Sequence, residues 1–339
     1  MRKRSGGAVS RGEFVRPSDR DHLRGTSGAG RRHRPRWVRR LAIGALATLV
    51  VLATGFRPDR DPLALEARYA TPPSKFVEVD GLRVHYRDRG AGPTVLLVHG
   101  GSASLFSWEG WAALLALHHR VITLDMPGHG LTGPDPKARY APAEMAEFLD
   151  AFASALRLGR FTIGGQSMGG DVAWHYAIQH PERVERLILV DANGLPRLEP
   201  RPMGSRIRAS SVLGPVVRWV TPRFIVASAL RDTYGDPSRL TEAVVDRDYE
   251  LMLRDGNREA TRTRFAEGED GMDARLGEIH VPTLVLWGDR DQVILPKYGE
   301  EFRARIPRAE LFLLRGLGHM SMEEDPVASV APVLRLLDR

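Results

Sequence analysis

Ser167 is the residue whose surroundings first suggest chemistry. It lies in the segment 165–170, which reads Gly-Gln-Ser-Met-Gly-Gly, between an apolar run at 160–163 and a run of helical spacing at 171–179. Glycines around a serine at a sharp strand-to-helix turn allow a strained backbone that projects the hydroxyl above a sheet, an arrangement called a nucleophile elbow. The N–H of Met168, in the first turn of the expected helix, would then be available to an oxyanion. The competing interpretation of the pattern is a flexible Gly-Ser loop.

An acid and a histidine that could activate this serine follow later in the chain, each after an expected strand. The apolar run at 280–287 leads into Gly-Asp-Arg-Asp at 288–291, and a short apolar strand at 310–314 leads into a glycine-flanked loop that contains His319. A histidine on such a loop is poorly placed for core packing and well placed for a site. We therefore expect His319 to accept the proton of the serine hydroxyl, rather than to be a surface histidine.

These residues belong to a set of motifs that together resemble the α/β-hydrolase family. The resemblance covers the chain from about residue 75 to the C-terminus. Five motifs carry it: His-Gly-Gly at 99–101 after the strand at 94–98, Asp-Met-Pro-Gly-His-Gly at 125–130 after the strand at 120–124, the elbow around Ser167, Trp-Gly-Asp-Arg-Asp at 287–291, and Gly-His at 318–319.

The resemblance implies a catalytic triad of Ser167, Asp291 and His319. In family members of this type the acid is usually the last residue of a Gly-x-x-Asp turn, and that position is Asp291 in this chain. Asp289 is the competing candidate, and we expect it to be a turn residue that binds local backbone N–H groups.

The oxyanion hole is expected to consist of two backbone N–H groups, those of Gly101 and Met168. A glycine at the first position lets the backbone approach a substrate closely. Ser102 replaces Gly101 if the loop is shifted by one residue. A serine at the elbow disfavours the haloalkane dehalogenase and epoxide hydrolase chemistries of the family, because both rely on an aspartate nucleophile there.

The expected function is hydrolysis of carboxylic esters of small molecules through an acyl-enzyme intermediate, with no cofactor and no metal. Two other hydrolytic activities stay open: cleavage of a carbon–carbon bond in a ring-cleavage product, or of an amide as in a proline iminopeptidase. The Gly-rich segment that ring-product hydrolases commonly carry after the oxyanion turn is missing from residues 102–108. A third interpretation is a membrane-tethered ligand-binding protein that keeps a triad with little turnover.

Composition excludes several classes of protein. The chain has 339 residues, 42% of them hydrophobic, which is enough for one large α/β domain. Thirteen Lys and Arg fall in the first forty residues, so the net charge of +7 is a property of that end and offers no basic stripe for nucleic acid. The sequence has no cysteine, and its eleven histidines lack the spacing of metal ligands. Composition does not indicate the oligomeric state.

The N-terminal part reads as a tail, a membrane segment and a linker. Residues 1–36 are rich in Arg, Gly and Ser and are expected to be disordered. Residues 37–56 contain an uncharged apolar stretch and are expected to be a transmembrane anchor, or alternatively a cleaved signal segment. Either interpretation places the catalytic domain outside the cytoplasm, membrane-anchored in the first case and secreted in the second. Residues 57–74 contain four prolines and are expected to be a linker.

The remaining chain is expected to form a mostly parallel, doubly wound sheet with a helical cap inserted after the sixth strand. Residues 75–192 and 279–339 would form the core, since strand and helix patterns alternate there. Residues 193–278 show no strand signal and would form the cap, with helical segments at 212–220, 223–231 and 240–254. Strands are expected at 76–79, 82–86, 94–98, 121–124, 161–163, 184–190, 283–286 and 311–314.

Overall fold

The computed structural model describes residues 36–197, 199, 210, 214–266 and 270–338. The chain divides into two compact units, Met1–Ala47 and Thr48–Arg339. The second unit contains the sheet and every residue expected to belong to the active site. The disordered tail expected at residues 1–36 lies, apart from its last residue, outside the described part of the chain.

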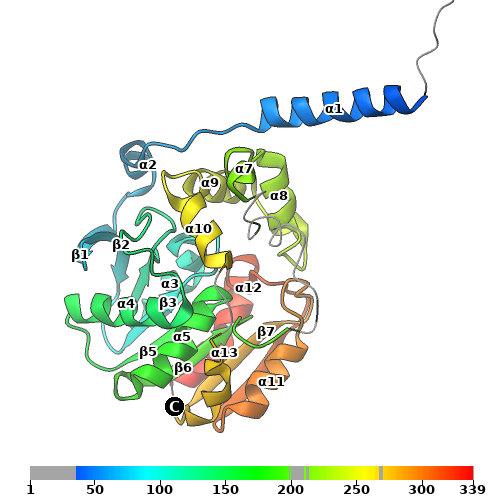
Figure 1. Ribbon diagram of the computed structural model, residues 1–339. Helices are drawn as coiled ribbons and strands as arrows, with labels where there is room; N and C mark the ends of the chain where they lie inside the picture. Colours follow the sequence, from blue (N-terminus) through cyan, green and yellow to red (C-terminus); the bar gives the residue numbers. More distant parts are fainter. Residues whose placement is uncertain (1–35, 198, 200–209, 211–213, 267–269, 339) are drawn as a thin grey trace, which may run out of the picture. The chain divides into compact units, whose positions relative to one another are not determined.

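An eight-stranded sheet forms the centre of the second unit (Figure 1). The strand order is β1-β2-β4-β3-β5-β6-β7-β8, with β2 antiparallel to both of its neighbours and every other pair parallel. This is the mostly parallel, doubly wound sheet that the sequence predicted. The strands span Ser74–Val79 (β1), Leu82–Arg89 (β2), Thr94–Val98 (β3), Arg120–Leu124 (β4), Phe161–Gln166 (β5), Val184–Val190 (β6), Thr283–Gly288 (β7) and Ala309–Leu314 (β8).

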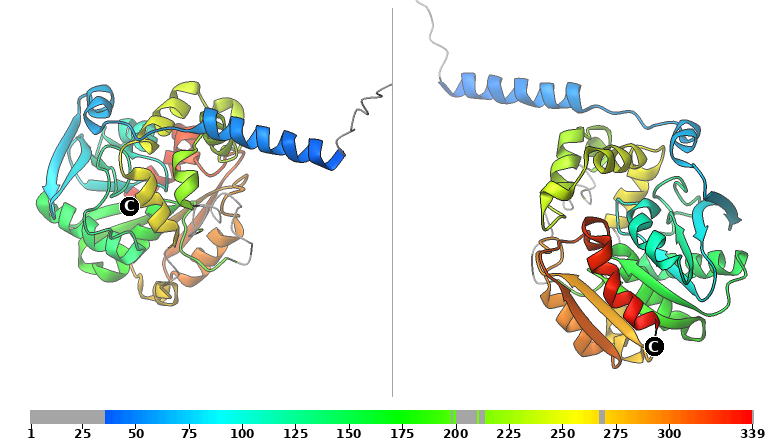
Figure 2. Two further views of the ribbon diagram at one scale, coloured as in Figure 1. Left: turned by 45° about the horizontal axis from the view of Figure 1, so that its top comes forward. Right: turned by 180° about the vertical axis from the view of Figure 1, so that it is seen from behind.

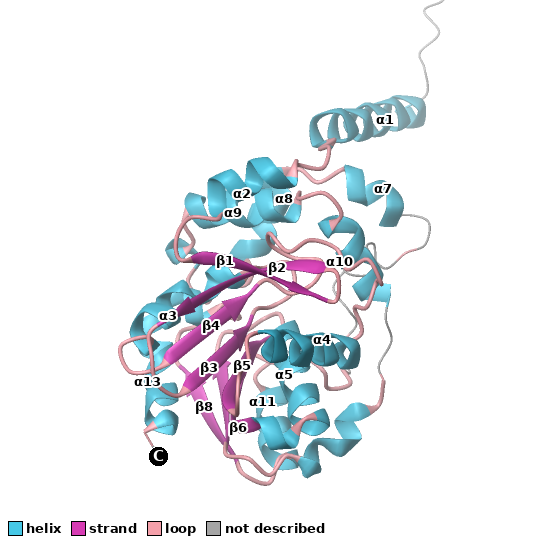
Figure 3. Cartoon of the chain, turned by 90° about the vertical axis from the view of Figure 1, so that its left-hand side faces the viewer, coloured by secondary structure: helices cyan, strands magenta, loops and turns pink. Residues whose placement is uncertain are grey.

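Helices cover the sheet on both faces, and β3 shows why its sequence is apolar without alternation. Side chains point to opposite faces along a strand, so Val95 and Leu97 enter one buried cluster while Leu96 and Val98 enter the other. All four side chains are fully buried. The first cluster is covered by α3 and α13 and the second by α4, α5 and α11 (Figure 3). The five helices are α3 (Glu109–Leu115), α13 (Pro326–Leu337), α4 (Pro142–Ala155), α5 (Met168–Gln179) and α11 (Lys297–Arg305).

The carboxyl ends of the parallel strands meet at one edge of the sheet. The register pairs Val98 with Gly165, Gln166 with Val190, and Val190 with Leu286. The loops that follow β5, β6, β7 and β8 therefore lie next to one another, although they are far apart in the sequence. In open α/β sheets this edge is where ligands bind.

A set of helices inserted between β6 and β7 forms the cap, at the position that the sequence predicted. Figure 2 shows these helices together over the carboxyl edge of the strands. The sequence did not predict α10, because Asn-Arg-Glu-Ala-Thr-Arg-Thr-Arg-Phe-Ala has no apolar stripe of helical period. The cap elements are α7 (Gly214–Trp219), α8 (Arg223–Arg231), α9 (Glu242–Met252), α10 (Asn257–Ala266) and two short 3-10 helices (Pro237–Arg239 and Met272–Glu278).

The N-terminal part differs from its prediction in two respects. Residues 37–56 lie almost wholly in one helix, α1 (Arg36–Gly55), but no helix in the described part of the chain is long and apolar enough to cross a membrane. The structure therefore does not support the expected transmembrane anchor. The uncharged stretch in this region is only sixteen residues long, about 24 Å as a helix, which is shorter than a hydrocarbon layer of about 30 Å.

Residues 57–74, expected to be a linker, contain a helix that packs onto the domain. This helix, α2 (Pro62–Tyr69), is capped at its N-terminus by the side chain of Asp61. Its Leu65 is buried in a small cluster with Phe106 and Leu251, and its Arg68 pairs with Glu250 of the cap at 2.8 Å. The prolines suggested a linker, but one of them occupies the first helical position, where proline is tolerated.

Candidate active site

The backbone at Ser167 has the conformation of a nucleophile elbow. Ser167 joins β5 to α5 with φ of 51° and ψ of −114°, which is strained for a residue with a side chain. The neighbouring glycines make the turn possible: a Cβ at Gly165 would lie 2.0 Å from the carbonyl oxygen of Gly169, and a Cβ at Gly169 would lie 2.1 Å from that of Val98. Glycine is therefore required sterically at both positions, and the segment is not a flexible loop.

Hydrogen bonds fix this turn to the end of β6. The N–H of Ser167 donates to the carbonyl of Val190 at 3.0 Å, and its own carbonyl accepts from the N–H groups of Asp171 and Asn193, each at 3.0 Å. Met168 begins α5, so its N–H has no partner inside the helix. The elbow thus presents both a hydroxyl and a backbone donor at the edge of the sheet.

Asp291 and His319 form a buried pair beside the elbow. Nδ1 of His319 lies 2.7 Å from Oδ2 of Asp291, and both side chains are almost completely inaccessible to solvent. The other oxygen of Asp291 accepts from the N–H groups of Val293 at 2.7 Å and Ile294 at 3.0 Å, so the carboxylate is held in one orientation. An imidazole held in this way at Nδ1 has Nε2 available for proton transfer.

Gln166, which the sequence analysis did not single out, links the histidine to the elbow. Its Nε2 donates to the carbonyl oxygen of His319 at 2.9 Å, and the side chain is fully buried. Because Gln166 precedes Ser167 directly, this bond joins the loop after β8 to the loop after β5. Only the three-dimensional structure places these two segments side by side, so no local sequence pattern could have identified the contact.

The structure places Asp291, and not Asp289, against the histidine. Asp289 is exposed, and its Oδ1 accepts a hydrogen bond from the N–H of Gly316 at 2.7 Å. Its carboxylate therefore binds the backbone of the loop that leads to His319, 27 residues further along the chain, whereas the sequence analysis expected it to bind local N–H groups.

A second buried acid, Asp191, lies behind this pair and was missed by the sequence analysis. It follows β6 directly and is completely buried, and it accepts hydrogen bonds from the N–H of Gly288 at 2.8 Å and from Oγ of Ser321 at 3.2 Å. Burial, and then the charge of Asp291, raise the pKa of Asp191 well above the usual range for aspartic acid. The signal was present in the sequence, since an acid after β6 must lie beside an acid after β7.

The grouping of Asp191, Asp291 and His319 also bears on metal binding. These residues place oxygen or nitrogen atoms within 4.8 Å of one another, and they are the one such group among the described residues. Each of those side chains is engaged in hydrogen bonds within the protein. We therefore interpret the group as a hydrogen-bonded cluster within the protein, in which burial and the charge of Asp291 raise the pKa of Asp191.

The expected oxyanion loop follows β3 and is ordered by a buried histidine. Nδ1 of His99 donates to the carbonyl of Gly100 at 2.7 Å, and its Nε2 accepts from the N–H of Met126 at 3.0 Å. Burial lowers the pKa of His99, in agreement with a neutral ring that both donates and accepts. Gly101 and Met168 face each other, because a Cβ at Gly101 would lie 3.8 Å from the Cβ of Met168. The backbone of Gly101 therefore lies close to Met168, and the nearest atom to that Cβ would be Nη2 of Arg264 at 2.7 Å.

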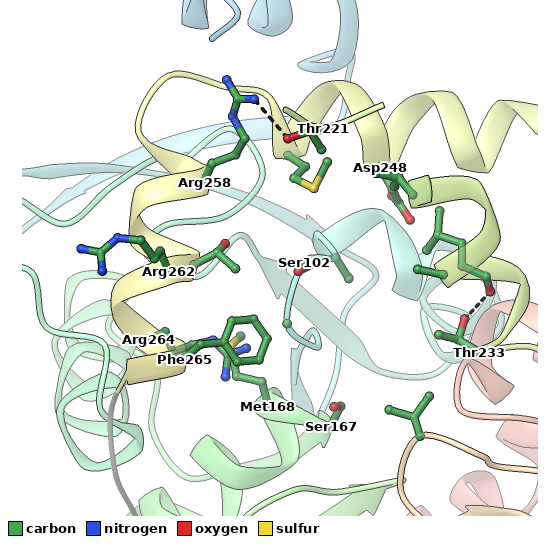
Figure 4. A pocket seen from close by; sticks show the side chains of 18 of the residues that line it. Ser102, Ser167, Met168, Thr221, Thr233, Asp248, Arg258, Arg262, Arg264 and Phe265 are labelled. Carbon is green, nitrogen blue, oxygen red and sulfur yellow. Dashed lines mark hydrogen bonds between the residues drawn. The ribbon is translucent and has the colours of Figure 1, made fainter. Parts of the chain in front are cut away.

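A cavity of about 400 Å³ lies between the core and the cap. Ser167, Met168, Gly101 and His319 line it together with residues of the cap. Figure 4 shows Ser167 and Met168 across the cavity from Arg258 and Thr221. α10 contributes three arginines to the lining, Arg258, Arg262 and Arg264, and Figure 4 shows the guanidinium of Arg262 on the outer side of this helix. The apolar lining includes Val220, Ile225, Val226, Leu230, Met252 and Phe265.

Comparisons with known proteins agree with this fold. A family model described as the alpha/beta hydrolase fold matches residues 93–229. The chain is 32% identical over 301 residues to an uncharacterised protein of Mycobacterium tuberculosis (strain ATCC 25618 / H37Rv), covering 83% of this chain and 84% of that protein. It is 28% identical to 2-hydroxymuconate semialdehyde hydrolase of Pseudomonas sp. (strain CF600), covering 72% of this chain and 86% of that protein.

A solved structure of a membrane phospholipase A, described as a bacterial virulence factor, superposes with a TM-score of 0.65 at 28% identity, covering 89% of this chain and 96% of that one. The chain belongs to the α/β-hydrolase family.

Proposed function

We propose that this hydrolase cleaves carboxylic esters through a serine acyl-enzyme. The observation that carries the proposal is that Ser167, on the strained elbow, and His319, held by the buried Asp291, line one cavity. A serine hydroxyl is a poor nucleophile without an adjacent base, and a histidine fixed by a carboxylate supplies one.

Each group has a defined task in the proposed reaction. His319 takes the proton from the hydroxyl of Ser167 as the serine oxygen attacks the ester carbonyl. Asp291 holds the imidazole with Nδ1 protonated and stabilises its cation. The N–H groups of Gly101 and Met168 donate to the oxyanion, and His319 then protonates the departing alcohol. Water activated by the same histidine releases the acyl group in the second step.

The relatives support an ester substrate and leave one other hydrolysis as a second candidate. A phospholipase A cleaves an acyl ester, and that structure covers more of this chain than the semialdehyde hydrolase does. The semialdehyde hydrolase favours carbon–carbon bond cleavage as the alternative.

The test measures hydrolysis of p-nitrophenyl butanoate by the full chain and by Ser167→Ala. We expect the substitution to lower kcat by a factor of about 10³ or more. Ser154→Ala, at an exposed serine of α4, is the matched control and should keep full activity. Turnover of a vinylogous diketone acid with none of the ester would favour carbon–carbon cleavage, turnover of a prolyl amide would favour a peptidase, and stoichiometric binding without turnover would favour a ligand-binding protein.

We also propose that the catalytic domain lies outside the cytoplasm. The support is the sequence pattern alone: thirteen Lys and Arg within the first forty residues, followed by sixteen uncharged residues. Protease added to intact cells should remove the catalytic domain if it is anchored, and the domain should appear in the medium if it is secreted. Complete protection of a cell-associated domain would contradict the proposed location.

A further inference from the structure

Asp248 is a buried acid that lines the same cavity as Ser167. It lies on α9, and only 4% of its surface is exposed. Figure 4 shows it on the cap side of the cavity, across from Arg262 and Arg264. Among the described residues that line this cavity, it is the one carboxylate. Its position suggests a role toward a bound molecule.

Only one of its two oxygens has a partner. Oδ1 accepts a hydrogen bond from Nε of Arg247 at 2.8 Å. Oδ2 is buried and has no hydrogen-bond partner within the described part of the chain. Leaving a buried carboxylate oxygen unpaired is costly, so a ligand that donates a hydrogen bond there would remove an existing penalty.

Arg247 orients this carboxylate but is shared with another acid. Its Nη2 donates to Oε1 of Glu323 at 2.6 Å, and Oε2 of Glu323 accepts from the hydroxyl of Tyr234 at 3.1 Å. Burial raises the pKa of Glu323. The guanidinium is thus held between Asp248 and Glu323, and its position determines which oxygen of Asp248 is left for a ligand.

Two of the arginines around the cavity have acids of their own. Arg258 pairs with Asp59 at 2.6 Å, and Arg262 pairs with Glu259 at 2.6 Å. Much of the remaining wall near α8 and α9 is aliphatic, including Ile225 and Met252. In such surroundings a hydrogen bond to a carboxylate is stronger than it would be in water.

We propose that Asp248 forms a subsite for a hydrogen-bond donor of the substrate, a hydroxyl or a protonated amine attached away from the scissile ester. The subsite rests on the proposed ester hydrolysis and adds a substrate class to it: esters whose alcohol or acyl part carries a donor group. A wholly apolar ester of the same size leaves Oδ2 unpaired and binds less well.

The experiment compares four esters of similar size with the full-length enzyme. They are propyl butanoate, hydroxypropyl butanoate, dimethylaminopropyl butanoate and propyl hydroxybutanoate. The second and third place a neutral or a cationic donor on the alcohol, and the fourth places a hydroxyl on the acyl part. We expect at least one donor ester to exceed propyl butanoate in kcat/KM by about tenfold or more, since a hydrogen bond to a charged group has that effect. The preferred ester identifies the side and charge of the donor.

Asp248→Asn tests the residue itself. Its amide oxygen would stay with Arg247, so its NH₂ would face the ligand, where it opposes a protonated amine and offers a hydroxyl only a neutral hydrogen bond in place of a charged one. We expect the donor preference to fall to about one or to invert, mainly through KM. Asp246→Asn is the matched control, because Asp246 lies on the same helix, is half-exposed and pairs with Arg223. It should keep the wild-type preference.

Two results would overturn the subsite. One is a wild-type preference near one for all three donor esters, which needs no variant and leaves ester hydrolysis intact. The other is an unchanged preference in a folded Asp248→Asn protein. Calorimetric titration of Ser167→Ala with the same esters gives the ratio of Kd values without turnover. It therefore tests the subsite even if ester hydrolysis itself fails.

Discussion

Replacing Asp291 with asparagine should cripple hydrolysis while leaving the fold intact. The wild-type carboxylate accepts from Nδ1 of His319 at 2.7 Å and from the N–H groups of Val293 and Ile294. In the variant the two backbone N–H groups would bind the amide oxygen of the new side chain, so its NH₂ would face His319. That NH₂ would force Nδ1 to accept and place the ring proton on Nε2, where the histidine cannot act as a base.

The expected loss of kcat in Asp291→Asn lies between two limits. Loss of the correct tautomer lowers kcat by about 10⁴ in a triad, which is about 5.4 kcal/mol of transition-state stabilisation. Asp191 can offset part of it, because its carboxyl lies within 4.8 Å of the histidine. The charge of Asp291 helps to raise the pKa of Asp191, so removing that charge favours ionisation of Asp191. We therefore expect Asp291→Asn to lose about 10² to 10⁴ in kcat, and the double variant with Asp191→Asn to reach the larger loss.

The assay is steady-state hydrolysis of p-nitrophenyl butanoate, with thermal unfolding to confirm that each variant folds. Asp289→Asn is the matched control, because that carboxylate is exposed and its hydrogen bond goes to the N–H of Gly316. It should keep most of the activity. If Asp289→Asn lost its activity while Asp291→Asn stayed active, the assignment of Asp291 as the acid of the triad would be refuted. A double variant no slower than Asp291→Asn would refute the supporting role of Asp191.

Three further predictions concern stability. In denaturant unfolding, Gly169→Ala should destabilise the fold by about 2 kcal/mol or more, because its Cβ would lie 2.1 Å from a carbonyl oxygen. The control Gly159→Ala should be neutral, because a Cβ at Gly159 meets open space. Leu65→Ala should cost about 2 to 5 kcal/mol in the same assay, whereas Leu63→Ala, 72% exposed, should cost little; equal effects would contradict the packing of α2. Burial alone would lower the pKa of His175, but hydrogen bonds and charge from nearby aspartates raise it overall. The folded protein therefore gains stability from protonated His175. This gain is full below the unfolded pKa of about 6.5 and is lost as pH rises through the folded pKa. The difference in unfolding free energy between wild type and His175→Gln should therefore shrink with rising pH, and a difference that grows would contradict this sign.

The strands of the sheet could be predicted because each parallel strand is a continuous apolar run in the sequence. Residues such as Val95 and Leu96 are buried on opposite faces, and this requirement excludes polar residues from both. The elbow was predictable for a steric reason, since its glycines are dictated by contacts within a few residues and with β3. Local sequence therefore determined both the strands and the turn that holds Ser167.

Features that depend on pairing between distant segments could not be predicted in this way. α10 is held by polar contacts, such as the pair of Arg258 with Asp59, and these leave no apolar period in the sequence. Gln166 and Asp248 look like ordinary polar residues until the loop after β8 and the cap are placed beside them. The roles of these residues depend on how deeply they are buried and on which side chains lie beside them, and a single sequence shows neither.

The central claim is that His319 activates Ser167 as the nucleophile. The most direct measurement is labelling with a p-nitrophenyl phosphonate, followed by peptide mapping by mass spectrometry. The account predicts one adduct, on Ser167, formed at least about a hundredfold more slowly in His319→Ala. An adduct on another residue, or labelling of Ser167 at an unchanged rate without the imidazole, would contradict it.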